Sequence, residues 1–283
     1  MILDFGYDTR HAQAAVAVAQ RRGLPVPDPI PTTMAMVDVV MRAAHMKPPE
    51  RPTVDDLPQT TAELAALIEE RARAHRVAAS YREVAQDFIE PLARRLNAQV
   101  AAQVASWIAM LCPEFDRLVK QLRSLSKKLP DQLDAHLINW GDPEVSAPWA
   151  RAEGIAMQLD GIVGDRQTLA RASGLQGEGG PNAELYAVAA LPKPTTTDVV
   201  QHRLRTHISP ELQRWKELRH DPVRRWLHLV RSEHLTIQLA TPNEVRDRAA
   251  VRELWLEAIA VRGVAPVPGA KAIRAIEQVL QAA

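Results

Sequence analysis

The chain has few aromatic residues and almost no cysteine. Among 283 residues there is one cysteine, and Phe, Trp and Tyr together make up 4%. A single cysteine excludes an internal disulfide and a cysteine-rich zinc site, and it is typical of a reducing compartment. With so few aromatic rings, a core has to be packed from Leu, Ile, Val and Ala. The apolar neighbours of Cys112 indicate a buried structural thiol rather than a nucleophile.

The chain also lacks an excess of charge and a long apolar run. Its formal net charge is +1, so nucleic-acid binding would require a local basic patch. The best apolar stretch, residues 100–112, contains Gln103 and Ser106 and is too short to span a bilayer. No secretion signal is visible at the start. We therefore expect no membrane association and a cytoplasmic location, or a place within a virion assembled in the cytoplasm.

The common catalytic and cofactor motifs are missing as well. There is no Gly-x-Ser-x-Gly, no His-Glu-x-x-His, no P-loop and no cysteine cluster. We therefore expect no cofactor and no metal site, and the sequence favours a protein that is not an enzyme. Catalytic groups can be scattered along a chain, so an enzymatic bundle with a pocket around Glu217, His220 and His228 stays open as an alternative.

Proline is abundant, with 21 residues, and its placement is typical of helix starts. An Asp, Ser or Thr can cap the free N–H groups of a first turn, and Pro suits the next position because its missing N–H has no partner there. This pattern recurs at Asp142-Pro143, Ser209-Pro210, Asp221-Pro222 and Thr241-Pro242. Thr60 and Glu63 have the spacing of a capping box. The sequence therefore predicts an all-α fold.

The longest predicted helix runs over about residues 60–111. Apolar residues recur there at seven-residue intervals, which predicts a heptad-like interaction seam formed by Leu67, Ala74, Tyr81 and Phe88. Small side chains in the alternate row, at Ala78 and Ala85, allow a partner helix to approach closely. Pro91 predicts a kink, because it removes a backbone hydrogen bond, and Pro113 predicts the start of another helix.

The spacing of the stretches that interrupt the helices divides the chain into four predicted regions. They are N-terminal helices with Pro-rich connectors (1–58), a long-helix region (59–141), helices with a Gly-rich loop at 174–182 (142–194) and a compact C-terminal helical bundle (195–283). In that bundle, helices are expected to begin near residues 198, 210, 222, 242 and 268. A short helix is expected at 131–140, and residues 185–191 form the one segment with strand character.

Basic residues are concentrated between residues 202 and 231. On the predicted helix that begins at Pro222, Arg224, His228 and Arg231 share one face. Such a face suits phosphate groups, and the alternative is an ordinary solvated helix surface. The candidate nucleic-acid-binding residues are Arg203, Arg205, Arg214, Arg224, Arg225, His228 and Arg231.

These patterns favour a non-catalytic α-helical interaction or assembly protein, such as a scaffold, an adaptor or a component of a larger complex. We expect a protein partner or self-association. The Ala-rich composition, with Arg far more frequent than Lys, resembles that of helical assembly proteins from GC-rich bacteria and their phages. The first alternative is a nucleic-acid-binding protein that uses the basic face at 202–231, and the second is the helical-bundle enzyme.

Overall fold

The computed structural model describes residues 8–130, 139, 141–174, 180, 182–263 and 268–282. These residues form ten α-helices, two short helices of other types and a two-stranded sheet. The all-α prediction is therefore confirmed, as is the long helix that begins near residue 60. The predicted short helix at 131–140 and the Gly-rich loop at 174–182 lie largely outside the described residues.

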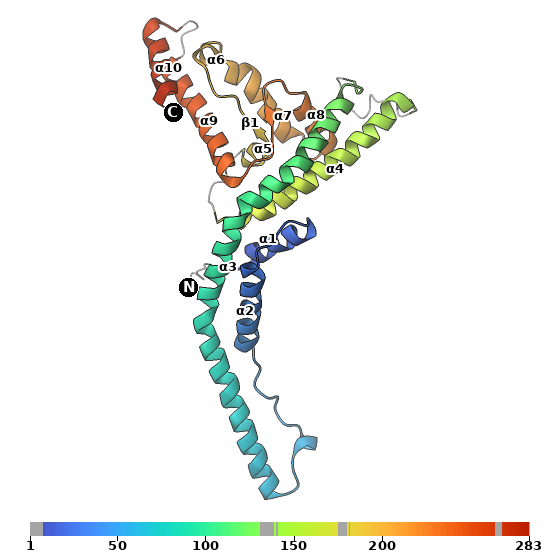
Figure 1. Ribbon diagram of the computed structural model, residues 1–283, viewed down its shortest axis with the longest axis vertical. Helices are drawn as coiled ribbons and strands as arrows, with labels where there is room; N and C mark the ends of the chain where they lie inside the picture. The colour runs from blue at the N-terminus through green and yellow to red at the C-terminus, as the bar shows by residue number, and fades with distance from the viewer. Residues whose placement is uncertain are drawn as a thin grey trace. The chain divides into compact units, whose positions relative to one another are not determined.

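The chain divides into two compact units, residues 1–103 and residues 104–283. The boundary falls inside the longest helix, α3 (Thr61–Ser126). The N-terminal unit also contains α1 (Arg10–Arg21), α2 (Pro29–Ala44) and the 3-10 helix η2 (Val54–Asp56). In this unit α2 lies beside α3 (Figure 1).

The C-terminal unit combines the end of α3 with the remaining helices and both strands. Its elements are α4 (Pro143–Arg171), α5 (Ala183–Tyr186), β1 (Ala189–Ala190), α6 (Thr196–Val200), the π-helix η3 (Leu204–Ile208), α7 (Ser209–Glu217), α8 (Pro222–Arg231), β2 (Thr236–Ile237), α9 (Pro242–Arg262) and α10 (Ala270–Ala282). The strands are antiparallel, with Ala189 opposite Ile237. The predicted strand character at 185–191 is confirmed by β1, whereas β2 was not predicted.

Helix α1 ends just before Gly23. Gly23 has a φ of 64°, which a residue without Cβ adopts at little cost. Its N–H donates to the carbonyl of Gln20, and the next N–H, of Leu24, donates to Ala19. These two bonds satisfy carbonyls at the end of the helix. Before this turn, Ala12, Ala15, Val16 and Ala19 are buried and form part of the core of the N-terminal unit.

Helix α3 is longer than predicted, because neither internal proline ends it. Pro91 and Pro113 both lie within the continuous helix. The start of a separate helix at Pro113 was a wrong prediction. Each proline removes one backbone hydrogen bond, at a cost of about 3 kcal/mol. Burial of the apolar face compensates, since Leu96, Val100, Ile108, Phe115 and Leu122 between and after the prolines have no exposed surface.

Most of the predicted helix starts are capped as expected. Asp142 accepts a hydrogen bond from the N–H of Glu144, and Asp221 accepts one from the N–H of Arg224. Thr241 and Glu244 form a complete capping box, as do Thr60 and Glu63. Ser209 is the exception. The π-helix η3 runs directly into α7, so Ser209 has helical geometry and makes no side-chain cap.

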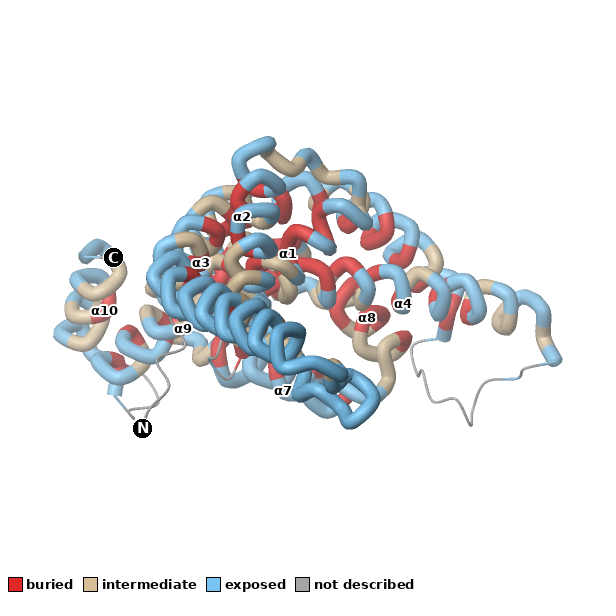
Figure 2. The backbone as a smooth tube through the Cα atoms, turned by 90° about the horizontal axis from the view of Figure 1, so that it is seen from below, coloured by how far each residue is buried: buried red, intermediate tan, exposed pale blue. Residues whose placement is uncertain are grey.

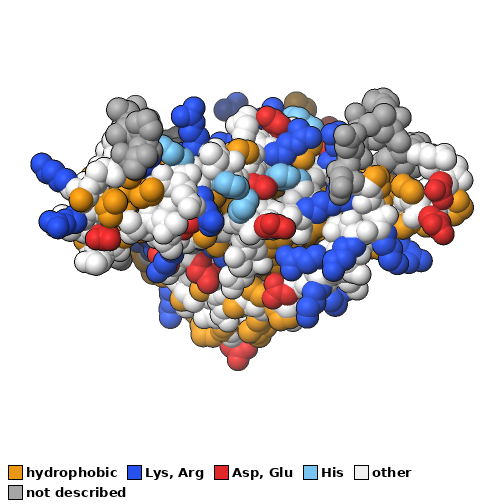
Figure 3. All heavy atoms as spheres, turned by 90° about the horizontal axis from the view of Figure 1, so that it is seen from above, with side chains coloured by type: hydrophobic (Ala, Val, Ile, Leu, Met, Phe, Trp, Pro, Cys, Tyr) orange, Lys and Arg blue, Asp and Glu red, His pale blue; other side chains and the backbone are white. Residues whose placement is uncertain are grey.

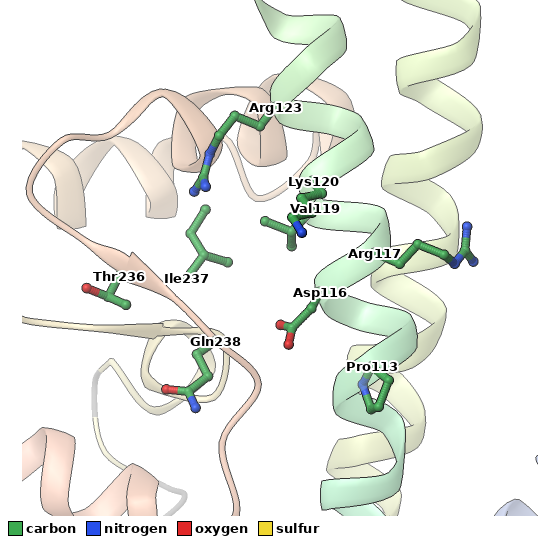
Figure 4. A pocket seen from close by; sticks show the side chains of 9 residues that line it. All are labelled: Pro113, Asp116, Arg117, Val119, Lys120, Arg123, Thr236, Ile237 and Gln238. Atoms are coloured by element: carbon green, nitrogen blue, oxygen red, sulfur yellow. The ribbon is translucent and has the colours of Figure 1, made fainter.

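The core of the C-terminal unit is organised around Trp226 on α8. Trp226 has no exposed surface and makes edge-to-face contacts with Phe115 of α3 and Trp215 of α7, at centroid distances of 6.0 and 5.5 Å. Its indole N–H donates to the Asp160 carboxylate of α4 over 2.7 Å. One side chain therefore links four helices, and in Figures 1 and 4 the second half of α3 runs beside α4.

Buried arginines link the helices of this unit to its irregular segments. Arg166 is 1% exposed, and its Nε donates to the carbonyl of Ala240 over 2.7 Å. Arg248 donates to the carbonyls of Tyr186, the last residue of α5, and Gln238, which directly follows β2. Burial lowers the pKa of Arg248, because it disfavours the charged guanidinium.

Candidate interaction surfaces

The first half of α3 carries large apolar side chains that the chain leaves exposed. The four that follow one another on one face are Val77 (45% exposed), Tyr81 (54%), Val84 (55%) and Phe88 (52%). Their spacing of four, three and four residues keeps them on one side of the helix. We call these four residues the docking row. Figure 2 colours the first turns of α3 almost entirely as exposed.

The neighbouring face of α3 is already covered by the chain itself. Ala78 and Ala85 are 3% and 5% exposed, and α2 packs beside them. The docking row therefore borders a helix pair. Between the two helices lies a groove of about 310 Å³ whose lining is almost entirely apolar. The groove is lined by Val39, Val40 and Ala43 of α2 and by Ser80, Tyr81, Val84, Ala85 and Phe88 of α3.

Opposite charges stand at the two ends of the docking row. Glu70 lies seven residues before Val77, and Arg95 lies seven residues after Phe88, so both project from the same side of α3. Both side chains are exposed, and neither forms an ion pair with another described residue. Their neighbours are paired within the helix instead, as Glu69 with Arg73 and Glu90 with Arg94.

The predicted interaction seam is divided between covered and open positions. Leu67 and Ala74 are half-buried, whereas Tyr81 and Phe88 are more than half exposed. The alternate row at Ala78 and Ala85 is buried within the chain. The connector before α3 accounts for part of this covering, because the carbonyl of Glu50 accepts a hydrogen bond from Arg71. The seam remains a prediction, and its open part coincides with the docking row.

Most of the basic residues predicted at 202–231 have acidic partners within the chain. Three of the arginines and the histidine lie close to carboxylates, in the pairs Arg203–Asp198 (3.0 Å), Arg214–Glu217 (3.1 Å), Arg224–Asp221 (3.7 Å) and His228–Glu211 (2.9 Å). These carboxylates offset much of the positive charge that the sequence shows at 202–231. Nucleic-acid binding by this face remains a prediction.

Two more of these arginines bind inside the C-terminal unit. The guanidinium of Arg225 lies 4.6 Å from the ring centroid of Trp215 and donates to Asp160 over 2.7 Å. Arg231 donates to the carbonyls of Ser126 and Leu129 and so caps the end of α3. Arg205 is exposed.

The structure draws attention to a basic surface that the sequence interpretation missed. Between Asp116 and Asp131 the chain has five basic residues and no acidic residue. All five are exposed, with Arg117, Lys120 and Arg123 on the second half of α3 and Lys127 and Lys128 in the turn that directly follows it, and we call the five residues the α3 basic row. Lys and Arg side chains gather on the right-hand half of the face shown in Figure 3. The absence of acids from this stretch was the sequence signal that could have found it.

A cleft of about 640 Å³ adjoins the α3 basic row. Helix α3 forms one side, with Asp116, Lys120 and Arg123, and the β2 segment forms the other, with Thr236 and Gln238 (Figure 4). In this view Asp116 and Arg123 extend from α3 toward β2, whereas Arg117 turns away toward α4. The residues that line the cleft therefore include three cations, one carboxylate and two neutral polar side chains.

The residues proposed for an enzymatic pocket have separate partners. Glu217 binds Arg214, His220 accepts a hydrogen bond from Arg219, and His228 lies against Glu211. Within the described part of the chain, no group of three or more His, Cys, Asp and Glu side chains is arranged to hold a metal ion.

Cys112 is half-buried, and its thiol lies near the carbonyls of Ile108 and Leu239. Burial raises the pKa of the Cys112 thiol, and Asp116 and Glu244 add to the effect. A raised pKa lowers the thiolate fraction, which suits the structural role expected for this residue.

Comparisons with known proteins identify no relative of this chain. None of the described helices is long and apolar enough to cross a membrane. Comparison with models of protein families, with curated protein sequences and with solved structures finds no match.

Proposed function

We propose that the protein is a non-catalytic component of a helical assembly and that two copies pair through their docking rows. The observation that carries this proposal is the row itself, four large apolar side chains on one face of α3 that are each about half exposed. Single exposed apolar residues are ordinary on protein surfaces, but a contiguous set marks an interaction site.

The charges at the ends of the row favour a second copy as the partner. In an antiparallel pair related by two-fold symmetry about the midpoint between Arg82 and Glu83, Glu70 of each copy lies opposite Arg95 of the other. The same register places Val77 opposite Phe88 and Tyr81 opposite Val84. Apolar residues thus meet apolar residues, and each end has an ion pair that sets the helix direction.

The size of the surface favours a reversible dimer. The stretch from Glu70 to Arg95 is about 38 Å long, and a helix is about 10 Å across. Pairing along this length buries several hundred Å² on each copy, which is at the low end for specific interfaces. The α2 residues beside the groove, including Val39, which is 57% exposed, widen the contact.

The proposal is tested by the mass of the full chain in solution, measured by light scattering from about 1 to about 100 μM. We expect the wild type to approach twice the chain mass of 31.4 kDa as its concentration rises. The variant Tyr81→Ser/Phe88→Ser should remain at 31.4 kDa at every concentration. Loss of two aromatic side chains on each copy removes most of the apolar contact.

The matched control is Met110→Ser/Met157→Ser, which changes two exposed apolar residues outside the docking row. This control should dimerise like the wild type. A wild type that stays at the mass of one chain, or a Tyr81→Ser/Phe88→Ser variant that dimerises normally, contradicts the proposal.

A further inference from the structure

The α3 basic row is not neutralised by the rest of the described chain. None of its five residues forms an ion pair with a described acidic side chain, and Arg117 makes a single hydrogen bond, to the neutral Gln121. In contrast, four of the seven residues predicted at 202–231 have a carboxylate within 3.1 Å. Three of the chain's seven lysines lie in this row, although Arg is four times as frequent overall.

Stabilisation of the helix end does not account for this charge. Cations near a helix C-terminus interact favourably with the carbonyl groups there, but the effect is confined to about the last turn. Arg117 and Lys120 lie more than one turn before Ser126, where α3 ends. Moreover, Arg231 already donates to the carbonyls of Ser126 and Leu129.

The cleft beside the row adds neutral donors on its opposite side. Thr236 carries an exposed hydroxyl group. The amide oxygen of Gln238 accepts a hydrogen bond from Arg248, which leaves the amide N–H groups for a ligand. Phosphate oxygens in nucleic-acid complexes are bound by this combination of Lys, Arg and neutral hydroxyl or amide donors.

We infer that the α3 basic row and this cleft bind the phosphate backbone of double-stranded nucleic acid without sequence preference. Lys120 and Arg123 share one face of α3, because they are three residues apart, and Lys127 lies in the turn that directly follows the helix. Their span of about 10 Å corresponds to about six charges of a DNA duplex, so each cation has a phosphate within reach.

The lining of the cleft favours a duplex over other polyanions. No aromatic side chain lines it, so the base stacking that supports single-strand binding is missing among its residues. Val119 is 6% exposed and Ile237 is half-buried, so neither side chain is open enough to serve as the anchor of an acidic peptide.

The test uses the full-length chain and a fluorescent DNA duplex of about 20 base pairs, with binding followed by anisotropy. With about four phosphate contacts, wild-type affinity should fall about 100-fold between about 50 and about 200 mM salt. The variant Lys120→Gln/Arg123→Gln/Lys127→Gln should lose most of the affinity at low salt. The slope of log affinity against log salt should also become shallower by about three.

The matched control removes three cations from the other predicted surface, as Arg203→Gln/Arg205→Gln/Arg214→Gln. All six substituted residues are exposed, so far-ultraviolet circular dichroism should show an unchanged fold for both variants. We expect the control to keep wild-type binding. Absence of duplex binding at about 50 mM salt, or loss of binding in the control but not in the α3 variant, overturns the inference.

Two further measurements separate this site from a general attraction between charges. Asp116 is the one carboxylate that lines the cleft, so Asp116→Asn should tighten duplex binding several-fold. Polyglutamate of similar charge should bind much more weakly than the duplex. Equal binding of polyglutamate, or weaker duplex binding by Asp116→Asn, contradicts the assignment to nucleic acid.

Discussion

The two halves of helix α3 have similar apolar periodicity, but the chain covers the large apolar side chains of the second half more completely than those of the first. In the second half Leu96, Leu111 and Leu122 are at most 2% exposed, whereas Tyr81 and Phe88 in the first half are more than half exposed. Periodicity predicts that one face of a helix is apolar, and it does not specify what covers that face. In the second half the cover comes from the same chain, and for the docking row in the first half we assign it to a second copy.

The two halves differ in charge as well. The first half mixes acids and bases, some of them paired along the helix, such as Glu69 with Arg73. The end of the second half carries bases alone, in the α3 basic row. We therefore assign the pairing of two copies to the first half of α3 and the binding of a polyanion to the end of its second half.

The largest expected effect separates the covered half from the open half. Trp226→Ala removes the buried ring that contacts Phe115 and leaves Asp160 without its indole donor. It should lower the free energy of unfolding by about 3–5 kcal/mol. Phe88→Ala, measured where the chain is monomeric, should change it by less than about 0.5 kcal/mol. Urea unfolding followed by circular dichroism gives both values, and similar losses would remove the distinction between the halves.

A smaller effect is expected at the end of the covered half. Arg231→Met keeps the length of the side chain but removes the donor to the carbonyls of Ser126 and Leu129. We expect a loss of about 2 kcal/mol in the free energy of unfolding, because charged donors to buried carbonyls are costly to lose. Arg205→Met, at an exposed position, is the control and should be neutral. A neutral Arg231→Met would show that the end of α3 does not need this cap.

The two capping boxes, at Thr241 and Thr60, allow the two regions to be compared through a loss of about 1 kcal/mol in the free energy of unfolding. Thr241→Ala removes the cap of α9 and should lower the global free energy of unfolding by about that amount. Thr60→Ala removes the equivalent cap of α3, but at turns that are mostly exposed. Hydrogen exchange should then show faster exchange only in the first turns of α3. A global loss of stability in Thr60→Ala would indicate that these turns are tied to the core.

The smallest expected effect concerns Cys112 in the covered half. Because burial raises the pKa of its thiol, alkylation by iodoacetamide should have its pH midpoint above the ordinary cysteine value. The folded state favours the neutral thiol, so its contribution to stability is present at neutral pH and is lost as pH rises through the folded pKa. A midpoint at or below the ordinary value would contradict the burial of this residue.

Local signals predicted much of the fold. The caps at Thr60 and Thr241 each depend on residues close together in the sequence, and the structure contains both. Pro113 misled the interpretation, because its local cost is offset by side chains such as Phe115 that pack against distant residues. The two-residue strand β2 exists through its pairing with β1, and it is too short for an alternating pattern to show.

The candidate sites were harder to predict, since ion pairing depends on tertiary contacts. Arg225 binds Asp160, which is 65 residues away in sequence, so a count of local charges could not detect the pairing. The α3 basic row differs, because the acid-free stretch after Asp116 is visible in the sequence. For the docking row the periodicity was visible, but only the structure shows that Ala78 and Ala85 are covered while Tyr81 and Phe88 are open.

The most direct test of the central claim is a charge swap at the ends of the docking row, followed by sedimentation equilibrium. Glu70→Arg and Arg95→Glu should each weaken dimerisation roughly 10-fold, because each places like charges together at both ends of the pair. The double variant Glu70→Arg/Arg95→Glu restores both ion pairs and should recover wild-type affinity, and the control Glu83→Arg, on the far side of α3, should have no effect. A double variant no tighter than either single variant would contradict the antiparallel pairing of two copies.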